Sequence, residues 1–163
     1  MAFVALGSNL GDSRAKILRA MNLLQSLSVL PLLRSSLWET TPVDCPPGSP
    51  LFINAVAGLA PRAAETPRSL LARLQALEKE MGRPPKKILN EPRVIDLDLI
   101  AFGTQTVAEP DLILPHPRAR LRRFVLEPLR EIAPDFILPG QSKTVAELLQ
   151  GLETSESLRR VAD

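Results

Sequence analysis

The segment 94–102 constrains the fold of this chain more than any other. It reads Val-Ile-Asp-Leu-Asp-Leu-Ile-Ala-Phe, so two acidic residues, Asp96 and Asp98, alternate with aliphatic ones. Residues two apart on a β-strand point to the same face. A strand therefore places both carboxylates on one face, opposite Ile95, Leu97 and Leu99. Asp is unfavourable in strands, and adjacent like charges repel each other, so we expect this half-buried strand to carry its carboxylates for a chemical purpose.

A divalent cation would relieve the repulsion between Asp96 and Asp98. Mg²⁺ prefers hard oxygen ligands and is commonly held by one or two carboxylates together with substrate phosphates. The spacing therefore predicts a magnesium site. The alternative is a pair of carboxylates on a solvent-exposed face.

Two clusters of basic residues flank this strand in the sequence. The first, in segment 83–93, holds Arg83, Lys86, Lys87 and Arg93. The second, in segment 116–123, holds Arg118, Arg120, Arg122 and Arg123, next to His116. Arginine offers a fixed fork of donors that suits phosphate oxygens, so both clusters favour a bound polyphosphate. The alternative is a pair of solvated loops, with His116 as a structural residue.

Hydrophobic periodicity places strands at 2–6, 32–40, 51–60 and 94–102. The sequence also predicts two helices between these strands. Asp12 or Ser13 caps the first, and the second begins at Thr66-Pro67 and ends at Gly82. The order β-α-β-β-α-β predicts an α+β, ferredoxin-like fold: an antiparallel sheet with helices on one face and the other face free to carry a site. Gly7 is expected to turn the chain out of its strand.

The C-terminal third adds further pieces to this pattern. A short helical stretch is expected around 127–132, and Thr144 with Glu147 forms a capping box for a last helix. The tail from about 153 is polar and is expected to fray.

Length and composition bound the remaining possibilities. The 163 residues suit one catalytic domain over 1–163. No apolar stretch is long enough to span a bilayer, and the first residues lack the basic region of a signal peptide, so we expect a cytoplasmic monomer. The single cysteine, Cys45, excludes an internal disulfide, and the only histidine is far from it in sequence. The net charge of +2 is not typical of a nucleic-acid-binding protein.

Three further residues suit a flat heterocycle. Phe52 and Asn54 share one strand face, and Phe124 follows the second arginine cluster. Aromatic rings stack on such a ligand while an amide bonds its edge. The alternative is that both rings belong to the core. The glycine-rich start, Leu-Gly-Ser-Asn-Leu-Gly, lacks the Gly-Lys-Ser/Thr ending of a P-loop.

Taken together and in order, these motifs form a recognisable series. They are Leu6-Gly-Ser-Asn-Leu-Gly11, Thr41-Pro42, Phe52-Ile-Asn-Ala-Val56, Glu78 with Gly82-Arg83, Pro92-Arg-Val-Ile-Asp-Leu-Asp-Leu99, Leu114-Pro-His-Pro-Arg118, Arg122-Arg-Phe-Val-Leu126 and Glu131-Ile-Ala-Pro134. The series covers roughly residues 2–140. It resembles the 6-hydroxymethyl-7,8-dihydropterin pyrophosphokinases of folate synthesis, which transfer diphosphate from ATP to a pterin alcohol and release AMP.

The resemblance implies a role for each matching residue. Asp96 and Asp98 are implied to bind two Mg²⁺ ions that bridge the ATP phosphates. Arg83, Arg93 and Asp98 are implied to be catalytic. The implied ATP contacts are Gln75, Glu78, Arg83, Arg93, the backbone at Leu99, His116 and Arg122. The implied pterin contacts are Thr41, Pro42, Asp44, Phe52, Asn54 and Phe124.

This chain also departs from the family pattern and leaves rival functions open. Asn90-Glu91 stand where an aromatic residue and a glycine are common, and Cys45 and Ser49 stand where Gly and Gln are common. Three other functions remain open: a metabolite-binding regulatory module, an RNA-binding domain on a similar sheet and a different ATP-dependent kinase. An RNA-binding domain of this kind needs exposed aromatic residues on its central strands. The chain holds only five Phe and one Trp, which disfavours this alternative.

Overall fold

The computed structural model describes residues 1–41, 45–84 and 93–162. In chain order, its elements are β1 (Ala2–Ser8), α1 (Ser13–Leu24), the 3-10 turn η1 (Gln25–Leu27), β2 (Leu33–Arg34), β3 (Trp38–Thr40), β4 (Phe52–Leu59), α2 (Pro67–Glu80), β5 (Asp96–Phe102), β6 (Val107–Glu109), β7 (Leu112–Leu114), the 3-10 turn η2 (Ala119–Leu121), α3 (Arg123–Ile132), α4 (Val145–Gln150) and β8 (Leu158–Arg160).

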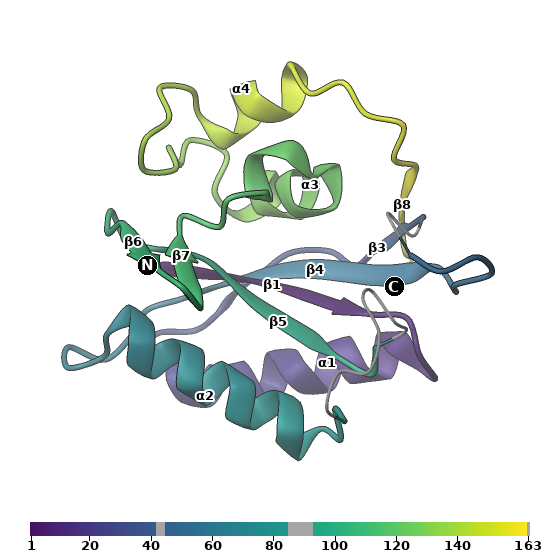
Figure 1. Ribbon diagram of the computed structural model, residues 1–163, viewed down its shortest axis with the longest axis horizontal. Coiled ribbons are helices and arrows are strands. Elements are labelled where there is room, and N and C mark those ends of the chain that lie inside the picture. The colour runs from purple at the N-terminus through teal and green to yellow at the C-terminus, as the bar shows by residue number, and fades with distance from the viewer. Residues whose placement is uncertain (42–44, 85–92, 163) are drawn as a thin grey trace.

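The main sheet is antiparallel, with strand order β5-β1-β4-β3-β8, and β2 also pairs with β4. Helices α1 and α2 lie side by side on one face of it (Figure 1). The strands of the β-α-β-β-α-β unit thus run β5-β1-β4-β3, with β1 and β4 in the centre, which confirms the predicted ferredoxin-like fold. The segment predicted as one strand over 32–40 is divided into β2 and β3, because the register against β4 shifts by one residue between Arg34 and Trp38.

The first core lies between the sheet and helices α1 and α2. Its sheet side includes Leu6, Leu97 and Leu99, and the helices contribute aliphatic residues spaced three or four apart. The largest fully buried helix residues of this layer are Ile17, Met21, Leu24, Leu70 and Leu74. Because Leu97 and Leu99 point into this core, Asp96 and Asp98 are forced onto the opposite face of β5, as predicted.

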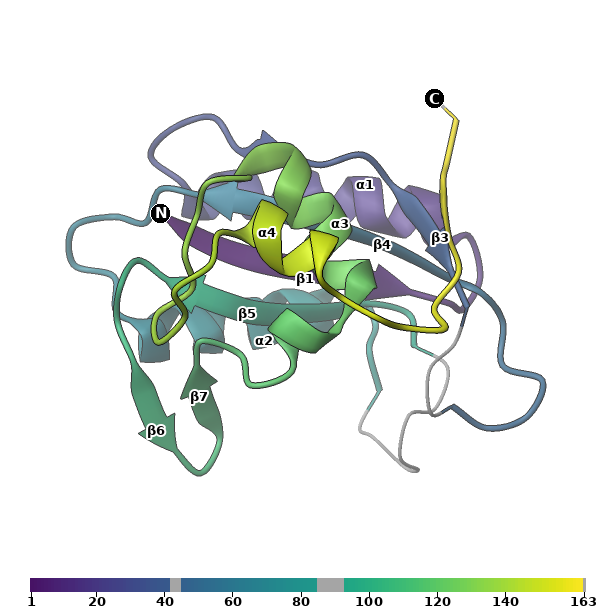
Figure 2. The ribbon, with the colours of Figure 1, turned by 90° about the horizontal axis from the view of Figure 1, so that it is seen from above.

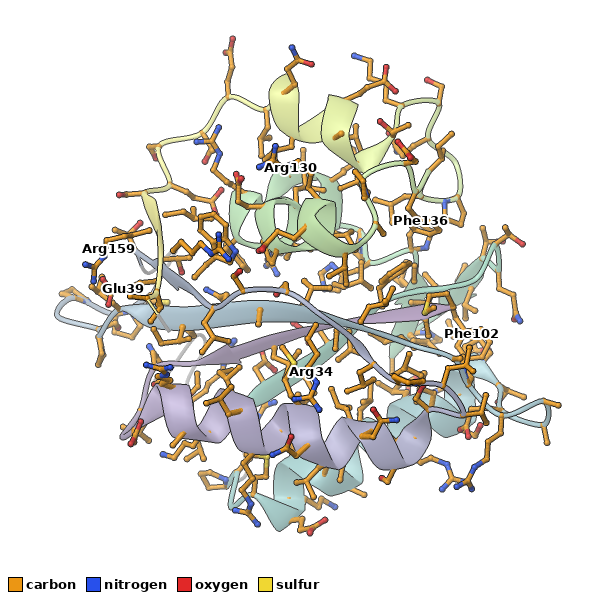
Figure 3. The ribbon with its side chains drawn as sticks, turned by 180° about the vertical axis from the view of Figure 1, so that it is seen from behind. Arg34, Glu39, Phe102, Arg130, Phe136 and Arg159 are labelled. Atoms are coloured by element: carbon orange, nitrogen blue, oxygen red, sulfur yellow. The ribbon has the colours of Figure 1, made fainter. Side chains whose placement is uncertain are left out.

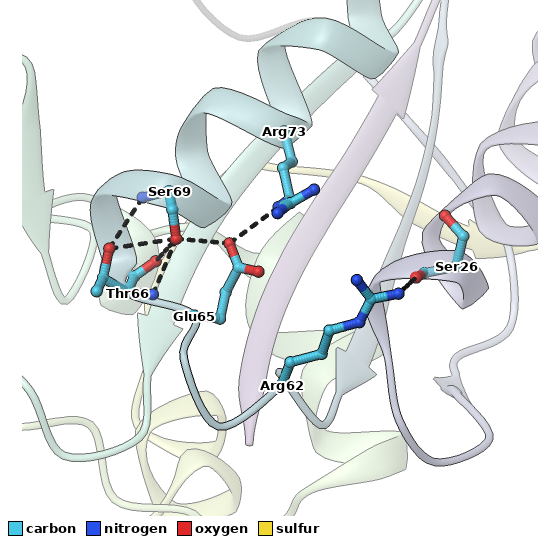
Figure 4. A network of polar contacts seen from close by, with 6 residues as sticks. All are labelled: Ser26, Arg62, Glu65, Thr66, Ser69 and Arg73. Carbon is cyan, nitrogen blue, oxygen red and sulfur yellow. Dashed lines mark hydrogen bonds and ion pairs between the residues drawn. The ribbon is translucent and has the colours of Figure 1, made fainter.

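The N-terminal end of α2 is fixed by polar contacts (Figure 4). Thr66 caps the helix by accepting a hydrogen bond from Ser69 N, and the Ser69 hydroxyl accepts one from Thr66 N. The same hydroxyl donates to Glu65 Oε1 at 2.6 Å, and Glu65 also pairs with Arg73 at 3.2 Å. The network ends with Arg62, which donates to the carbonyl of Ser26 at 3.5 Å. These bonds anchor the helix whose far end delivers Glu78 and Arg83 to the other end of the sheet.

We expected the second face of the sheet to be free, but α3 packs against part of it, and α4 lies over α3 (Figures 1 and 2). Phe3, Val56 and Ile100 of the sheet form a second core with apolar residues of these helices. Phe136, labelled in Figure 3, packs on Phe3 with ring centroids 4.9 Å apart. The second core leaves uncovered the end of this face where Asn54, Asp96 and Asp98 lie.

Four local expectations are corrected. Helix α3 begins at Arg123 and not near 127, β6 and β7 form a hairpin that was not predicted, and the tail contributes strand β8 instead of fraying. Gly7 does not turn the chain, because β1 continues through Ser8, and the positive φ of +72° belongs to Gly11. In the described ranges, no helix is both long and apolar enough to cross a bilayer.

Candidate active site

A cavity of about 560 Å³ opens at the uncovered end of the sheet. Strands β1, β4 and β5 form its floor, and the segment 116–125 forms one wall. The described residues that line it are Ala5, Leu6, Gly7, Thr40, Thr41, Cys45, Phe52, Asn54, Arg83, Arg93, Asp96, Asp98, Ile100, His116, Arg118, Leu121, Arg122, Phe124 and Val125. Ten of the residues predicted for the site are thus brought together from five separate segments.

The acidic pair stands on the cavity floor. In the ladder Asp96 is opposite Gly7 and Asp98 is opposite Ala5, so small residues of β1 leave both carboxylates accessible from the cavity. Burial, together with the charges of Asp96 and Glu78, raises the pKa of Asp98 from 3.8 to about 7, against the opposing effect of nearby arginines. The charged form of Asp98 is therefore unfavourable in the folded protein, and a cation beside it would stabilise that form.

Arg83 and Arg93 hold Asp96 between them. Arg83 Nη1 lies 2.9 Å from Asp96 Oδ1, and Arg93 Nη1 lies 2.9 Å from Asp96 Oδ2. Arg83 also donates to Glu78, whose carboxylate accepts a bond from Leu97 N at 3.3 Å. Burial opposes the charge on Arg83, but the carboxylates of Asp96 and Glu78 outweigh it and raise its pKa. Burial raises the pKa of Glu78, with Arg83 acting in the opposite direction.

His116 and Arg122 form the opposite side of this charged region. His116 N donates to the carbonyl of Ile100 at 2.8 Å, and His116 Nδ1 accepts from Arg118 N at 3.2 Å. Burial, and then the charges of Arg122 and Arg118, lower the pKa of His116 to about 4. Burial also lowers the pKa of Arg122, although Asp98 opposes this effect. At neutral pH the site therefore presents a neutral imidazole whose Nε2 carries the proton, since Nδ1 accepts a bond.

Aromatic side chains also line the cavity. Phe52 and Phe124 line it from β4 and α3, and the Arg122 guanidinium lies 5.3 Å from the centroid of the Phe124 ring. Asn54 is buried and donates from Nδ2 to Thr40 Oγ1 at 2.6 Å, which leaves Oδ1 as an acceptor. A Cβ built on Gly7 would lie 3.0 Å from Asn54 Oδ1, so the absence of a side chain at Gly7 is what makes room for this amide.

Comparison with known proteins decides among the rival functions. The family model of 7,8-dihydro-6-hydroxymethylpterin-pyrophosphokinase matches residues 3–134, most of the chain. The chain belongs to this pyrophosphokinase family. The resemblance seen in the sequence is therefore confirmed.

Individual relatives agree with the family assignment. The 2-amino-4-hydroxy-6-hydroxymethyldihydropteridine pyrophosphokinase of Pseudomonas aeruginosa is 40% identical over 148 residues, which is 90% of this chain and 88% of that protein. The protein of the same name from Synechocystis sp. is 35% identical over 152 residues, 93% of this chain and 76% of that protein. The folic acid synthesis protein fol1 of Pneumocystis carinii is 36% identical over 148 residues, and the chain spans 20% of its length.

Some residues to which the family resemblance gave a role lie elsewhere. Gln75 is exposed on α2 and is not among the described lining residues, and the Leu99 side chain is buried in the first core. Glu78 lies behind Arg83 and supports it. Pro42, Asp44 and the pair Asn90-Glu91 fall outside the described residues. The roles of Gln75, Glu78 and the Leu99 backbone in nucleotide binding stay predictions.

Sequence reasoning also missed several lining residues. Thr40 and Gly7 shape the amide end of the cavity, and Leu121 and Val125 extend the wall below Phe124. The period-two pattern of β1 could have indicated Gly7, since it places Gly7 on the same face as Ala5. The other three become lining residues through tertiary packing, for which the sequence carries no local signal.

Proposed function

We propose that this chain transfers diphosphate from ATP to the hydroxymethyl group of 6-hydroxymethyl-7,8-dihydropterin, giving AMP and the pterin diphosphate. Membership of the pyrophosphokinase family supports the reaction. The observation that carries the proposal is one cavity lined both by charged residues, Asp96, Asp98, Arg83 and Arg93, and by the aromatic rings of Phe52 and Phe124.

We further propose that Asp96 and Asp98 hold Mg²⁺, two ions in all, together with the ATP phosphates. Within the described ranges, no group of three or more His, Cys, Asp or Glu side chains is placed to hold a metal. Two carboxylates without a third protein ligand fit Mg²⁺, which completes its coordination with phosphate oxygens and water. When bound, the metal withdraws charge from the phosphate oxygens and so favours attack on phosphorus.

The arginines supply charge stabilisation from the protein side. Arg83 and Arg93 each form an ion pair with Asp96 through one nitrogen. A bound polyphosphate offers them oxygens of higher charge, with which guanidinium groups form strong hydrogen bonds. We infer that both arginines pass from Asp96 to the transferred diphosphate, which frees the Asp96 oxygens for the metal.

The reaction depends on alignment of the two substrates more than on covalent chemistry by the protein. The hydroxymethyl oxygen attacks the β-phosphorus, and the bond to the oxygen that bridges the α- and β-phosphates breaks, so that AMP leaves. The pterin ring would stack between Phe52 and Phe124, with Asn54 Oδ1 accepting from its edge. We propose that Asp98, which lines the cavity, or metal coordination lowers the proton affinity of the attacking hydroxyl group.

Thr41, Pro42 and Asp44 complete the proposed pterin site, and His116 with Arg122 completes the proposed ATP site. Gln75, Glu78 and the Leu99 backbone are proposed on the nucleoside side. The protein is proposed to act as a cytoplasmic monomer on these small molecules and not on nucleic acid, since the floor of its basic cavity carries two carboxylates that repel an extended phosphate backbone.

A nucleotide product assay tests the reaction. The protein is incubated with ATP, Mg²⁺ and 6-hydroxymethyl-7,8-dihydropterin, and AMP is separated from ADP. We expect AMP that depends on both the pterin and Mg²⁺, and its loss in Asp96→Asn but not in the exposed control Asp111→Asn. ADP in place of AMP would indicate an ordinary kinase, and ATP binding without turnover would indicate a regulatory module.

A further inference from the structure

The C-terminal segment 154–160 touches two walls of the cavity. On one side, β8 pairs with β3, and Leu158 lies opposite Thr40 in the ladder. Next to this pair, Thr41 N donates to the carbonyl of Ser157 at 3.3 Å. The contact is reinforced by the ion pair of Arg159 with Glu39 at 2.9 Å (Figure 3). The strand end that carries Thr40 and Thr41, two lining residues, is thus held by the tail.

On the other side, Glu156 binds the first turn of α3. Its Oε2 accepts a hydrogen bond from the backbone N of Arg123, the first residue of the helix, at 2.9 Å. Arg122 occupies the N-cap position of α3, and its side chain makes no capping bond. Glu156 therefore provides from a distant segment the capping acceptor that the local sequence lacks. A carboxylate at this position also interacts favourably with the helix dipole.

The conformation of Glu156 is itself fixed. Thr154 Oγ1 donates to Glu156 Oε2 at 3.0 Å, and Glu156 N donates back to Thr154 Oγ1 at 3.2 Å. Oε1 of Glu156 and Nε of Arg123 are the two buried side-chain polar atoms of the described residues that make no hydrogen bond. Burying such atoms lowers stability, so stability alone does not account for this carboxylate.

The residues on either side of Arg123 are those that face the cavity. Arg122 and Phe124 both line it, and the guanidinium of the first lies over the ring of the second. Because the first turn of α3 sets the backbone of both, a change at its cap moves the two side chains together. The matched family region ends at residue 134, so this support comes from a part of the chain beyond it.

We propose that Glu156 is a positioning residue of the active site: it caps α3 from the C-terminal tail and thereby holds Arg122 and Phe124 at the distance from β3 that the two substrates require. The inference rests on the proposed function, since it assumes that Phe124 stacks on the pterin and that Arg122 binds phosphate. It assigns the tail a role in substrate binding in addition to its strand pairing.

Three variants of the full-length protein test this. Glu156→Ala removes the acceptor, Glu156→Gln keeps an acceptor oxygen without the charge, and Glu153→Ala changes an exposed residue of the same tail as a control. Amide hydrogen exchange by NMR at Arg123 reports on the cap independently of activity. The KM for the pterin, kcat and the Tm are measured for each variant.

For Glu156→Ala we expect amide exchange at Arg123 to be about fivefold faster or more, which is typical of a lost N-cap, and the pterin KM to rise about tenfold while kcat changes less. Glu156→Gln should stay within about twofold of the unchanged protein in both respects, as should Glu153→Ala.

Two results would overturn the proposal. One is a lower Tm in Glu156→Ala with unchanged KM and unchanged exchange at Arg123, which would mean a purely structural tail. The other is a Glu156→Gln variant as impaired as Glu156→Ala, which would show that the capping bond is not what matters. Absence of pterin-dependent AMP in the unchanged protein would instead refute the proposed function, and the exchange data would still decide whether Glu156 orders the first turn of α3.

Discussion

Replacing Asp98 with Asn is expected to make the ligand-free protein more stable above neutral pH while abolishing its activity. Burial, then the nearby Asp96 and Glu78 carboxylates, raise the pKa of Asp98 to about 7. The charged form is therefore the unfavourable one in the folded protein. Asn has nearly the same shape and carries no charge, so the substitution removes this penalty without opening a cavity.

The size and the pH window follow from the pKa. The folded pKa lies above the ordinary value of 3.8, so between about pH 4 and pH 7 the folded protein keeps a proton that the unfolded chain releases. The free energy of unfolding therefore falls as the pH rises through this window. A pKa raised from 3.8 to about 7 corresponds to roughly 4 kcal/mol. The advantage of Asp98→Asn should be close to zero near pH 4 and reach about 2–4 kcal/mol at pH 8.5.

Urea unfolding without Mg²⁺ at pH 4.5 and pH 8.5 measures this difference directly. Asp135→Asn, a change at an exposed position, serves as the control and should show no such pH-dependent gain. Taking the difference between variant and unchanged protein at each pH cancels the titration of groups that do not interact with Asp98. Two results would refute the raised pKa of Asp98 and the electrostatic argument for a metal at this site. One is an equal free energy of unfolding for Asp98→Asn and the unchanged protein at both pH values, and the other is a lower one for Asp98→Asn at pH 8.5.

Three further outcomes are expected. Phe124→Ala should raise the pterin KM about tenfold or more, because stacking on an aromatic side chain contributes about 1–3 kcal/mol. The control Phe136→Ala, away from the cavity, should lower the Tm and leave KM unchanged. Equal KM values in the two variants would contradict the stacking role of Phe124. Gly7→Ala should raise the pterin KM with an unchanged circular dichroism spectrum, because its Cβ would lie 3.0 Å from Asn54 Oδ1; an unaltered KM would show that this amide does not contact the pterin. His116 should stay neutral from pH 8 down to about pH 5, since its pKa is lowered to about 4, and an NMR titration with a midpoint near 6.5 would contradict the buried, arginine-flanked position.

Much of the fold could be predicted because its signals are local. The alternation in β5 places Asp96 and Asp98 on one face. The side chains of Asp12, Thr66 and Thr144 each cap a helix by accepting a hydrogen bond from the backbone N three residues further on. These patterns act through the geometry of a single element. These features can therefore be predicted without knowing what the element packs against.

The parts that were missed depend on contacts between distant segments. The polar tail has no hydrophobic period, and β8 forms only because β3 offers it an open edge. Helix α3 starts four residues earlier than expected, and the N–H of its first residue, Arg123, donates to Glu156, 33 residues away. The same holds within the site: the charge pattern indicated Arg83 and Arg93 as phosphate ligands, but not that both would bind Asp96 in the ligand-free protein.

A crystal structure of the complex with Mg²⁺, 6-hydroxymethyl-7,8-dihydropterin and an ATP analogue with a methylene bridge between the α- and β-phosphates would test the central claim most directly. We expect carboxylate oxygens of Asp96 and Asp98 at about 2.1 Å from magnesium, the pterin between Phe52 and Phe124, and Arg83 moved from Asp96 to a phosphate oxygen. A metal bound away from the two aspartates, or a pterin that does not lie between Phe52 and Phe124, would contradict the assignment of this cavity as the site of diphosphate transfer.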